Sequence, residues 1–170
     1  MSDQALRAAQ RAAVPVAVAI AAIGAAAILG AYFFQYVMKL APCPLCLEQR
    51  VPYYLAIPLA LVVAWLAARG APRPLVWLGF GLLVALALVG AGLGAYHAGI
   101  EWKWWTGPTE CTGDMPQFDG GDLLGQIRNT SVVRCDQAAW RLFGLSLAGY
   151  NVLVSLALAA LGIVGIRRSR

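Results

Sequence analysis

Long apolar stretches separated by short charged segments dominate the pattern of this 170-residue chain. Uncharged runs cover residues 12–38, 51–68, 74–100 and 142–166. A helix needs about 20 mainly apolar residues to cross a bilayer, and the four runs are of that order. The pattern therefore predicts an all-α chain that forms a bundle of four transmembrane helices. Their expected bounds are about 14–37, 47–68, 74–96 and 142–166.

The composition agrees with a membrane protein and leaves no room for a separate soluble domain. Hydrophobic residues make up 61% of the chain and charged residues 12%, and the mean hydropathy is +0.69. A soluble domain of this size needs far fewer apolar residues. The first apolar run is too long for a secretory signal, whose core has about 7 to 15 residues. We therefore expect a retained first helix and a single integral membrane domain over residues 1–170.

The positions of the arginines predict how the bundle is oriented. Arginines precede the first span, link the second and third spans, and end the chain: Arg7, Arg11, Arg69, Arg73, Arg167, Arg168 and Arg170. Because basic residues favour the cytoplasmic side, both termini are expected there. The net charge of +5 is then a topology signal, and no nucleic-acid partner is expected.

All cysteines fall on the expected outer side, where an oxidising compartment favours disulfides. They are Cys43, Cys46, Cys111 and Cys135. The first two lie between the first two spans, and the other two lie in a long outer loop at about 97–141. Within this loop, residues 122–127 form a short amphipathic patch, which predicts a small helix on the membrane surface.

The spacing of the first pair, Cys43-Pro44-Leu45-Cys46, allows a small disulfide ring to close. Arg50 follows Cys46 by four residues, so the two would share a helix face, and a nearby cation favours the thiolate. Cys111 and Cys135 offer a second pair. Two pairs on one side of a membrane suggest a relay, in which one pair exchanges with a soluble partner and the other with a membrane acceptor.

The cysteines also allow two other interpretations, an inert disulfide and a zinc site. An inert stabilising disulfide remains open for Cys111 and Cys135, because outer loops are often stapled in this way. It is disfavoured for Cys43 and Cys46, because so small a ring constrains little chain. A zinc site of four thiolates, or of three thiolates and His97, is also disfavoured because structural zinc sites usually have two closely spaced ligand pairs. No metal is expected.

Polar residues near the cysteines are candidates for binding the acceptor. Arg50 could stabilise a thiolate or donate a hydrogen bond to a quinone carbonyl, although a snorkelling role is the default. His97 could donate a proton or a hydrogen bond to the acceptor, or be a simple interfacial group. Glu101, one helical turn beyond His97, could orient it. Gln35 is expected only as an interfacial residue, and Asn151 as a hydrogen-bonding group between helices.

These motifs occur together in one order along the chain. They are Cys43-Pro44-Leu45-Cys46 with Arg50, the stretch Tyr96-His97-Ala98-Gly99-Ile100-Glu101-Trp102, the pair Cys111 and Cys135, and Phe143-Gly144-Leu145-Ser146 with Asn151. The set resembles the disulfide bond formation protein B (DsbB) family over nearly the whole chain. Vitamin K epoxide reductases share the four-helix plan but place the closely spaced pair after the loop cysteines, which argues against them.

The resemblance implies a thiol oxidase of the bacterial inner membrane that reduces a quinone, either ubiquinone or menaquinone. Its partner would be a periplasmic thioredoxin-fold oxidase of the DsbA type. The resemblance also implies that Cys111 forms the mixed disulfide with the partner and that Cys135 completes the loop pair. Cys43 would exchange with the loop pair, and Cys46 would face the quinone.

The quinone pocket in such a protein would be lined by Arg50 and His97 at the outer rim of the bundle. Two other classes of function remain open from the sequence. A related enzyme could run electrons in the reverse direction as a membrane thiol reductase. A non-enzymatic membrane scaffold stapled by disulfides would show no thiol turnover.

Overall fold

The structure is a computed structural model that describes residues 3–108 and 134–169. Its elements are α1 (Asp3–Tyr32), the π-helix η1 (Phe33–Val37), α2 (Pro44–Glu48), α3 (Val51–Arg69), α4 (Arg73–Glu101), β1 (Arg141–Leu142), β2 (Leu145–Ser146) and α7 (Leu147–Arg168). Four helical segments in these ranges are long and apolar enough to cross a membrane. The four-helix bundle expected from the sequence is therefore confirmed.

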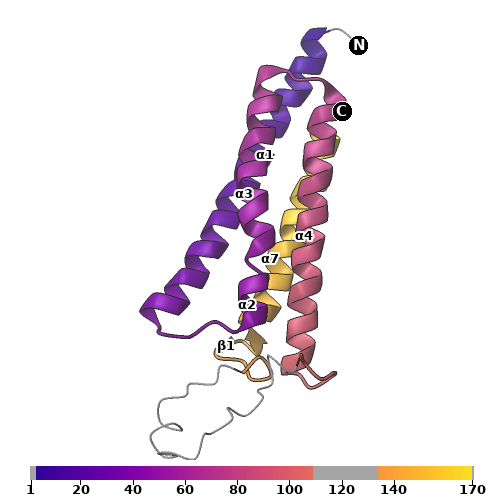
Figure 1. Ribbon diagram of the computed structural model, residues 1–170. Coiled ribbons are helices and arrows are strands. Elements are labelled where there is room, and N and C mark those ends of the chain that lie inside the picture. The colour runs from indigo at the N-terminus through magenta and orange to yellow at the C-terminus, as the bar shows by residue number, and fades with distance from the viewer. Residues whose placement is uncertain (1–2, 109–133, 170) are drawn as a thin grey trace, which may run out of the picture.

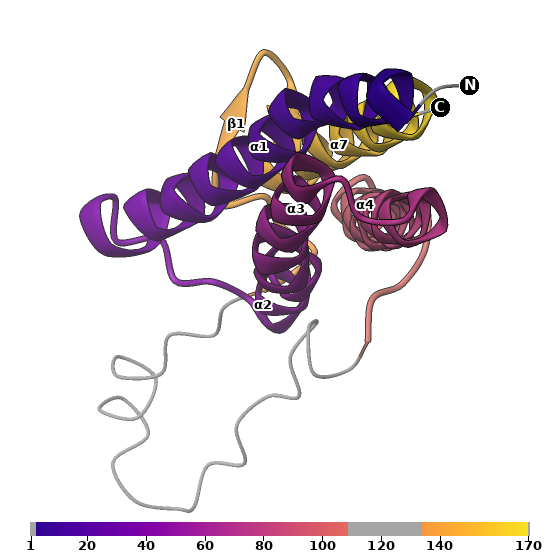
Figure 2. The same cartoon turned by 90° about the horizontal axis from the view of Figure 1, so that it is seen from above.

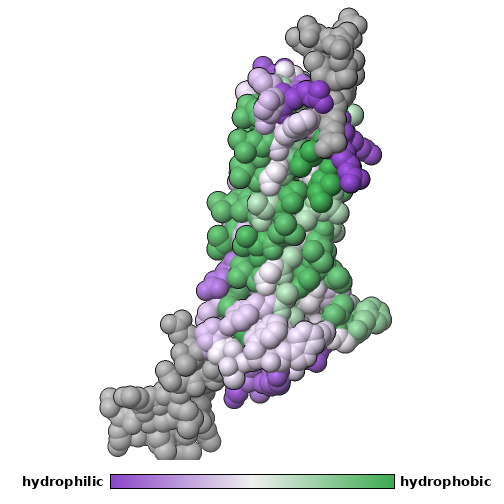
Figure 3. All heavy atoms as spheres, turned by 90° about the vertical axis from the view of Figure 1, so that its right-hand side faces the viewer, coloured by the Kyte–Doolittle hydropathy of each residue, from purple (hydrophilic) through white to green (hydrophobic). Residues whose placement is uncertain are grey.

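The four long helices form a ring in which each packs against two neighbours. α4 makes its most extensive contacts with α7, and α1 with α3, while α1–α7 and α3–α4 contacts close the ring (Figure 2). The start of α1 and the end of α7 lie at one end of the bundle, and α2 and β1 lie at the other (Figure 1). A broad apolar band separates more polar ends (Figure 3), as a bilayer-spanning protein requires.

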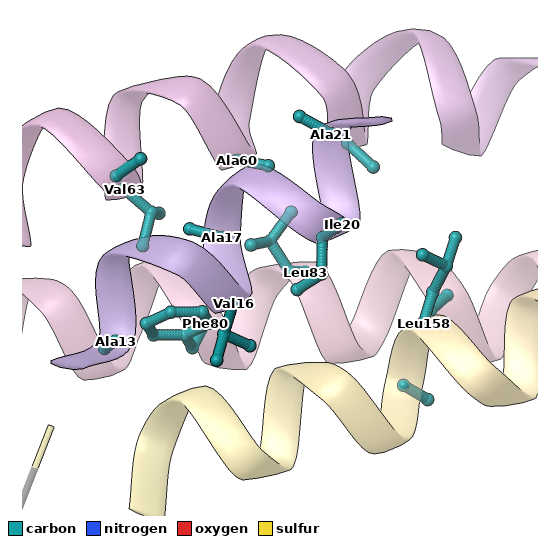
Figure 4. Packing of buried hydrophobic residues seen from close by; sticks show 14 of the residues in the cluster. Ala13, Val16, Ala17, Ile20, Ala21, Ala60, Val63, Phe80, Leu83 and Leu158 are labelled. Atoms are coloured by element: carbon teal, nitrogen blue, oxygen red, sulfur yellow. The ribbon is translucent and has the colours of Figure 1, made fainter. Parts of the chain in front are cut away.

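Small side chains let α1 and α3 approach closely. Ala13, Ala17 and Ala21 recur every four residues on one face of α1 and are buried, and Ala60 on α3 is fully buried (Figure 4). Lipid is as apolar as a helix surface, so association in a membrane depends on this kind of close packing. At the arginine-rich end, Gln10 Nε2 donates to the carbonyl of Ala71 at 2.6 Å, which ties α1 to the α3–α4 link.

The first helix begins at Asp3 rather than near residue 14, and the second expected helix is divided into α2 and α3 at residues 49–50. Two further differences in helix boundaries affect the site. α4 continues to Glu101 rather than ending near residue 96, because no helix breaker intervenes before Trp102 caps it. α7 begins at Leu147 rather than near residue 142, because Ser146 caps it by accepting a hydrogen bond from the Gly149 amide at 3.2 Å.

A tight hairpin occupies the positions before α7 that were expected to be helical. β1 and β2 pair antiparallel, with Leu142 opposite Leu145. The two residues between them, Phe143 and Gly144, have φ values of 49° and 82°. Positive φ at both positions is the requirement of a two-residue hairpin turn, and the glycine meets it without strain. The surface helix expected at residues 122–127 lies outside the described residues.

Glycines on α4 make room for polar side chains of α7. A Cβ added at Gly94 would lie 3.0 Å from Asn151 Nδ2 and 3.0 Å from Val152 Cγ2. A Cβ added at Gly90 would lie 3.0 Å from Ser155 Oγ. By contrast, a Cβ at Gly92 on the other side of α4 meets nothing within 4 Å. The Gly90–Gly94 face therefore sets the distance between α4 and α7.

We predict that Gly94→Leu destabilises the bundle, because the added side chain forces α4 and α7 apart. Overpacking of this kind costs about 1–3 kcal/mol. Thermal unfolding of the detergent-solubilised protein would show a lower Tm for Gly94→Leu than for wild type. Gly92→Leu, on the same helix but facing open space, is the matched control and should keep the wild-type Tm. Equal effects of the two substitutions would contradict this packing.

Candidate functional site

Cys43 and Cys46 lie on the first turn of the short helix α2. Cys43 caps this helix, since its Sγ accepts a hydrogen bond from the Cys46 amide at 3.3 Å. Pro44 follows at the first helical position, where its missing N–H costs nothing. The two sulfurs lie 2.7 Å apart, and both residues are free cysteines in this structure. The local fold thus holds a dithiol in the arrangement from which a disulfide can close.

The thiol of Cys43 holds its proton more tightly than an ordinary cysteine does. Its side-chain hydrogen bond with Cys46 is the main cause, and burial adds to it, so that the pKa of Cys43 is raised well above its usual value. Only 3% of Cys43 is exposed. A group near this sulfur must therefore stabilise negative charge when the thiolate forms.

A third sulfur lies next to this pair. Cys135 is fully buried and disulfide-bonded. Its Sγ, the Cys43 Sγ and a ring nitrogen of His97 all lie within 4.8 Å of one another. Thiol–disulfide exchange needs a thiol next to a disulfide sulfur, and Cys43 stands in that relation to Cys135. Cys111 lies outside the described residues.

The same three side chains are close enough to hold a metal ion. A metal would need deprotonated thiolates as ligands. Cys135 is disulfide-bonded and has no thiolate to offer. The geometry therefore favours sulfur exchange over metal binding.

A cluster of charges fixes the chain beside Cys135. Asp136 accepts hydrogen bonds from Arg134 Nε at 2.9 Å and from Lys103 Nζ at 2.6 Å. Lys103 lies two residues beyond the end of α4, so Asp136 joins the segment that carries Cys135 to this end of α4. Arg134 and then Lys103 hold the pKa of the Asp136 carboxyl well below its usual range. The ion pairs are thus present at about pH 4 and above, and are lost only as the pH falls through that lowered pKa.

His97 and Glu101 lie on the last turns of α4, on one face. His97 Nε2 is 3.7 Å from Cys43 Sγ and 3.9 Å from Glu101 Oε1. Both residues are buried. Within the described part of the chain, Glu101 Oε2 has no hydrogen-bond partner. The extension of α4 beyond residue 96 is what brings this imidazole and carboxyl group to the cysteines.

Arg50 is held from two sides. Its Nη1 donates to Gln35 Oε1 at 2.8 Å, and its guanidinium carbon lies 5.3 Å from the centre of the Tyr32 ring. Gln35 lies in the π-helix η1, where the wider turn changes the direction of side chains relative to α1. The expectation that Gln35 is only an interfacial residue was therefore incomplete, because it positions Arg50.

These groups line a cavity of about 260 Å³ between the end of α1 and the rest of the bundle. Its polar lining includes Cys43, Cys46, Arg50, His97 and Glu101. Its apolar wall includes Ala27, Ile28, Ala31, Phe34 and Trp140. The cavity thus places an apolar surface opposite a dithiol, a guanidinium group and an imidazole, which suits a flat apolar ligand with polar atoms at its edge.

A chain of hydrogen bonds extends from the site into the bundle. Gln49 lies 2.8 Å from His97 Nδ1 and 2.8 Å from Asn151, which in turn accepts from the Tyr53 hydroxyl at 2.6 Å. The expected interhelical hydrogen bond of Asn151 is confirmed. The sequence analysis missed Gln49 and Tyr53. Their only signal was position, since Gln49 follows Cys46 by three residues and Tyr53 follows Gln49 by four.

Comparison with known proteins adds independent information. The family model "Disulfide bond formation protein DsbB" matches residues 12–165. The chain belongs to the DsbB family. The family resemblance inferred from the cysteine, arginine and histidine motifs is therefore confirmed, and the roles of the single residues stay predictions.

Individual relatives agree with the DsbB family assignment. The chain is 32% identical to "Disulfide bond formation protein B" of Polaromonas sp. (strain JS666 / ATCC BAA-500), with 80% of each chain covered. It is also 32% identical to a protein of the same name from Verminephrobacter eiseniae, covering 81% of this chain and 79% of the relative. An uncharacterized protein of Rickettsia prowazekii, RP370, is 25% identical over 75% of this chain and 73% of its own length. No solved structure matches the chain.

We predict that Cys43 and Cys135 can be joined directly. In a Cys46→Ser/Cys111→Ser variant only these two thiols remain, and mild oxidation should link them rapidly because their sulfurs lie within 4.8 Å. Formation of the bond removes both thiols that a maleimide–polyethylene glycol reagent can label. The loss of label, seen on a gel, measures how much of the bond has formed. Adding Asp136→Asn should slow its formation by up to about fivefold, since the ion pairs position Cys135. Arg167→Gln, at the far end of the bundle, is the control; failure of the two thiols to link would contradict the geometry.

Proposed function

We propose that this DsbB-family protein is a thiol oxidase that reoxidises a periplasmic thioredoxin-fold disulfide donor of the DsbA type and passes the electrons to a quinone. The observation that supports it most directly is the position of Cys43. Its sulfur adjoins Cys46 at 2.7 Å, adjoins the sulfur of Cys135, and lines an apolar cavity with Arg50. One sulfur thus connects two redox pairs and a membrane-embedded cavity.

The proposed location is the bacterial inner membrane with both termini in the cytoplasm. Two facts support this orientation. Arg69, Arg73, Arg167 and Arg168 belong to the helix ends at one end of the bundle, while α2 and β1, next to the cysteines, lie at the other. Because basic residues favour the cytoplasmic side, the cysteines would then face the periplasm.

In the first part of the proposed relay, the partner reduces the outer pair, Cys111 and Cys135. A thiolate of the reduced partner attacks Cys111, forming a mixed disulfide and releasing the Cys135 thiolate. That thiolate attacks Cys43, so the Cys43–Cys135 bond forms, the Cys43–Cys46 bond breaks, and Cys46 leaves as a thiolate. The second partner thiol then resolves the mixed disulfide, which oxidises the partner and frees Cys111.

In the second part of the proposed relay, the loop disulfide re-forms by exchange within the protein. Cys111 attacks Cys135, the loop disulfide re-forms, and Cys43 leaves as a thiolate. The Cys43–Cys46 dithiol gives up two electrons and two protons as its disulfide closes, and a quinone in the cavity would accept them as a quinol. The net change is one disulfide formed in the partner for each quinone reduced.

The residues that line the cavity fit a quinone head group. The apolar wall matches its ring and tail, and Arg50 and His97 offer N–H groups that could donate to carbonyl oxygens. Arg50 is well suited because its hydrogen bond to Gln35 and its contact with the Tyr32 ring already position its guanidinium group. The protein's part is to hold the ring beside Cys46, to exclude water, and to supply donors where negative charge would develop.

The direct test of this function is quinone reduction by the purified protein with a reduced thioredoxin-fold donor of the DsbA type. We expect quinone absorbance to fall at the rate at which donor disulfide appears. Cys111→Ser should abolish exchange with the donor while the Cys43–Cys46 disulfide still forms. A preference for quinol and oxidised donor would indicate a reductase, and no thiol turnover at all would indicate a scaffold. Either result would refute the proposed activity.

A second prediction concerns quinone affinity. Arg50→Ala should raise the quinone KM by roughly tenfold or more while leaving the fold intact, because a charged donor to the acceptor is lost. Gln35→Leu should raise it by a smaller factor, about two- to fivefold, since the arginine remains but loses its acceptor. Tyr36→Phe, exposed on the same π-helix, is the matched control. An unchanged quinone KM in Arg50→Ala would rule out this role.

A further inference from the structure

Besides the Cys46 thiol at 2.7 Å, the imidazole of His97 lies close to Cys43 Sγ, at 3.7 Å, and can exchange a proton at neutral pH. It is 3% exposed, so its protons are set by its protein contacts rather than by water. Its two ring nitrogens meet different surroundings. Nδ1 faces the side-chain amide of Gln49, and Nε2 faces Cys43 Sγ. The tautomer of this ring therefore decides whether the nitrogen beside the sulfur carries a proton.

The orientation of the Gln49 amide can be deduced from its other partners. Its Nε2 lies 3.1 Å from the carbonyl oxygen of Leu45, an atom that only accepts hydrogen bonds. The atom placed there must therefore be the NH₂ group. The same NH₂ group lies 2.8 Å from His97 Nδ1. It can only donate, so Nδ1 must accept.

A second anchor supports the same orientation independently. Asn151 Nδ2 donates to the carbonyl of Gly90 at 3.2 Å, which identifies it as the NH₂ end of that amide. It lies 2.8 Å from Gln49 Oε1, which must then accept. The Asn151 oxygen in turn accepts from the Tyr53 hydroxyl. Turning the Gln49 amide over would set NH₂ against NH₂ and oxygen against the Leu45 carbonyl.

We infer that Gln49, braced by Asn151, is a positioning residue that keeps His97 in the tautomer whose Nε2 carries the proton and faces Cys43. An imidazole whose Nδ1 accepts is protonated at Nε2 when neutral. The same contact disfavours a second proton, because an N–H at Nδ1 would point at the Gln49 NH₂ group. The tautomer itself is inferred from the hydrogen bonds alone, whereas its role at the Cys43 sulfur rests on the proposed function.

The consequence concerns charge on the Cys43 sulfur. In the proposed relay Cys43 leaves as a thiolate when the loop disulfide re-forms, inside a site from which water is excluded. An N–H at Nε2 can donate to that sulfur, whereas a bare Nε2 lone pair would repel it. Glu101 Oε1 also faces this ring nitrogen, at 3.9 Å, and the Cys135 sulfur lies within 4.8 Å of one of the two ring nitrogens. The imidazole also has a hydrogen bond with the backbone of Cys135. A carboxylate at Glu101 would also favour a protonated Nε2.

The chain offers an unusually clean test, because it contains a single histidine. Protein labelled with ¹⁵N-histidine has one pair of ring nitrogens, and NMR shows which of them carries the proton. For the full-length protein in lipid nanodiscs we expect a protonated Nε2 and a bare Nδ1. In Gln49→Glu a carboxylate accepts where the amide donated, so the proton should appear at Nδ1. In Gln49→Met the preference for Nε2 should weaken.

Glu48→Gln is the matched control, because Glu48 is the exposed neighbour of Gln49 and its side chain lies outside this network. Its spectrum should equal that of wild type. A proton on Nδ1 in wild type, or no change in Gln49→Glu, would overturn the inference. If Gln49→Glu fails to fold, Gln49→Met carries the same comparison. Neither a quinone nor a donor protein is needed, so failure of the proposed oxidase activity and failure of this inference are distinguishable.

A chemical readout separates positioning from simple stability. In a variant that retains only Cys43, reaction with methyl methanethiosulfonate reports how readily the thiolate forms. Gln49→Met should slow this reaction roughly fivefold at a fixed pH, the size expected for loss of one hydrogen bond to the charged sulfur. Glu48→Gln should leave the rate unchanged. An equal rate in the Gln49→Met protein would contradict a role for Gln49 in preparing His97.

Discussion

The contact between Cys43 and Cys135 is the constraint on which the rest of the site depends. It joins two segments far apart in the sequence, one before α2 and one before α7. Each is held in place by separate means: Cys43 caps α2, and Asp136 ties the Cys135 segment to Lys103 at the end of α4. Sulfur exchange requires van der Waals approach of two specific atoms, so neither segment can shift by much without loss of the proposed relay.

The bundle satisfies this requirement by burying polar groups at one end of an apolar structure. Polar side chains within a membrane are costly unless they bond to one another. Gln49, Asn151, Tyr53 and Ser155 meet that condition, since each bonds to another member of the set. The glycines of α4 at positions 90 and 94 admit this network between the helices. Close packing and polar chemistry are therefore parts of one arrangement.

Much of the fold could be predicted from the sequence, because the length of an apolar span is a strong signal in membrane proteins. The grouping of Cys43, Cys46, Arg50 and His97 could also be predicted, since their motifs place each near the same end of a helix. The role of Gln35 could not, because it depends on a π-helical turn that no residue pattern announces. Gln49 was missed for a different reason: a glutamine beside a charged arginine has no chemistry of its own, and its importance lies entirely in which atoms it meets.

The depth at which the described cysteines lie has a consequence for selectivity. Cys43 is 3% exposed and Cys135 is 0% exposed, whereas Cys46 is only half-buried. A small thiol in solution, such as glutathione, therefore reaches Cys46 more readily than either of the other two sulfurs. This inequality comes from packing rather than from any difference in redox potential.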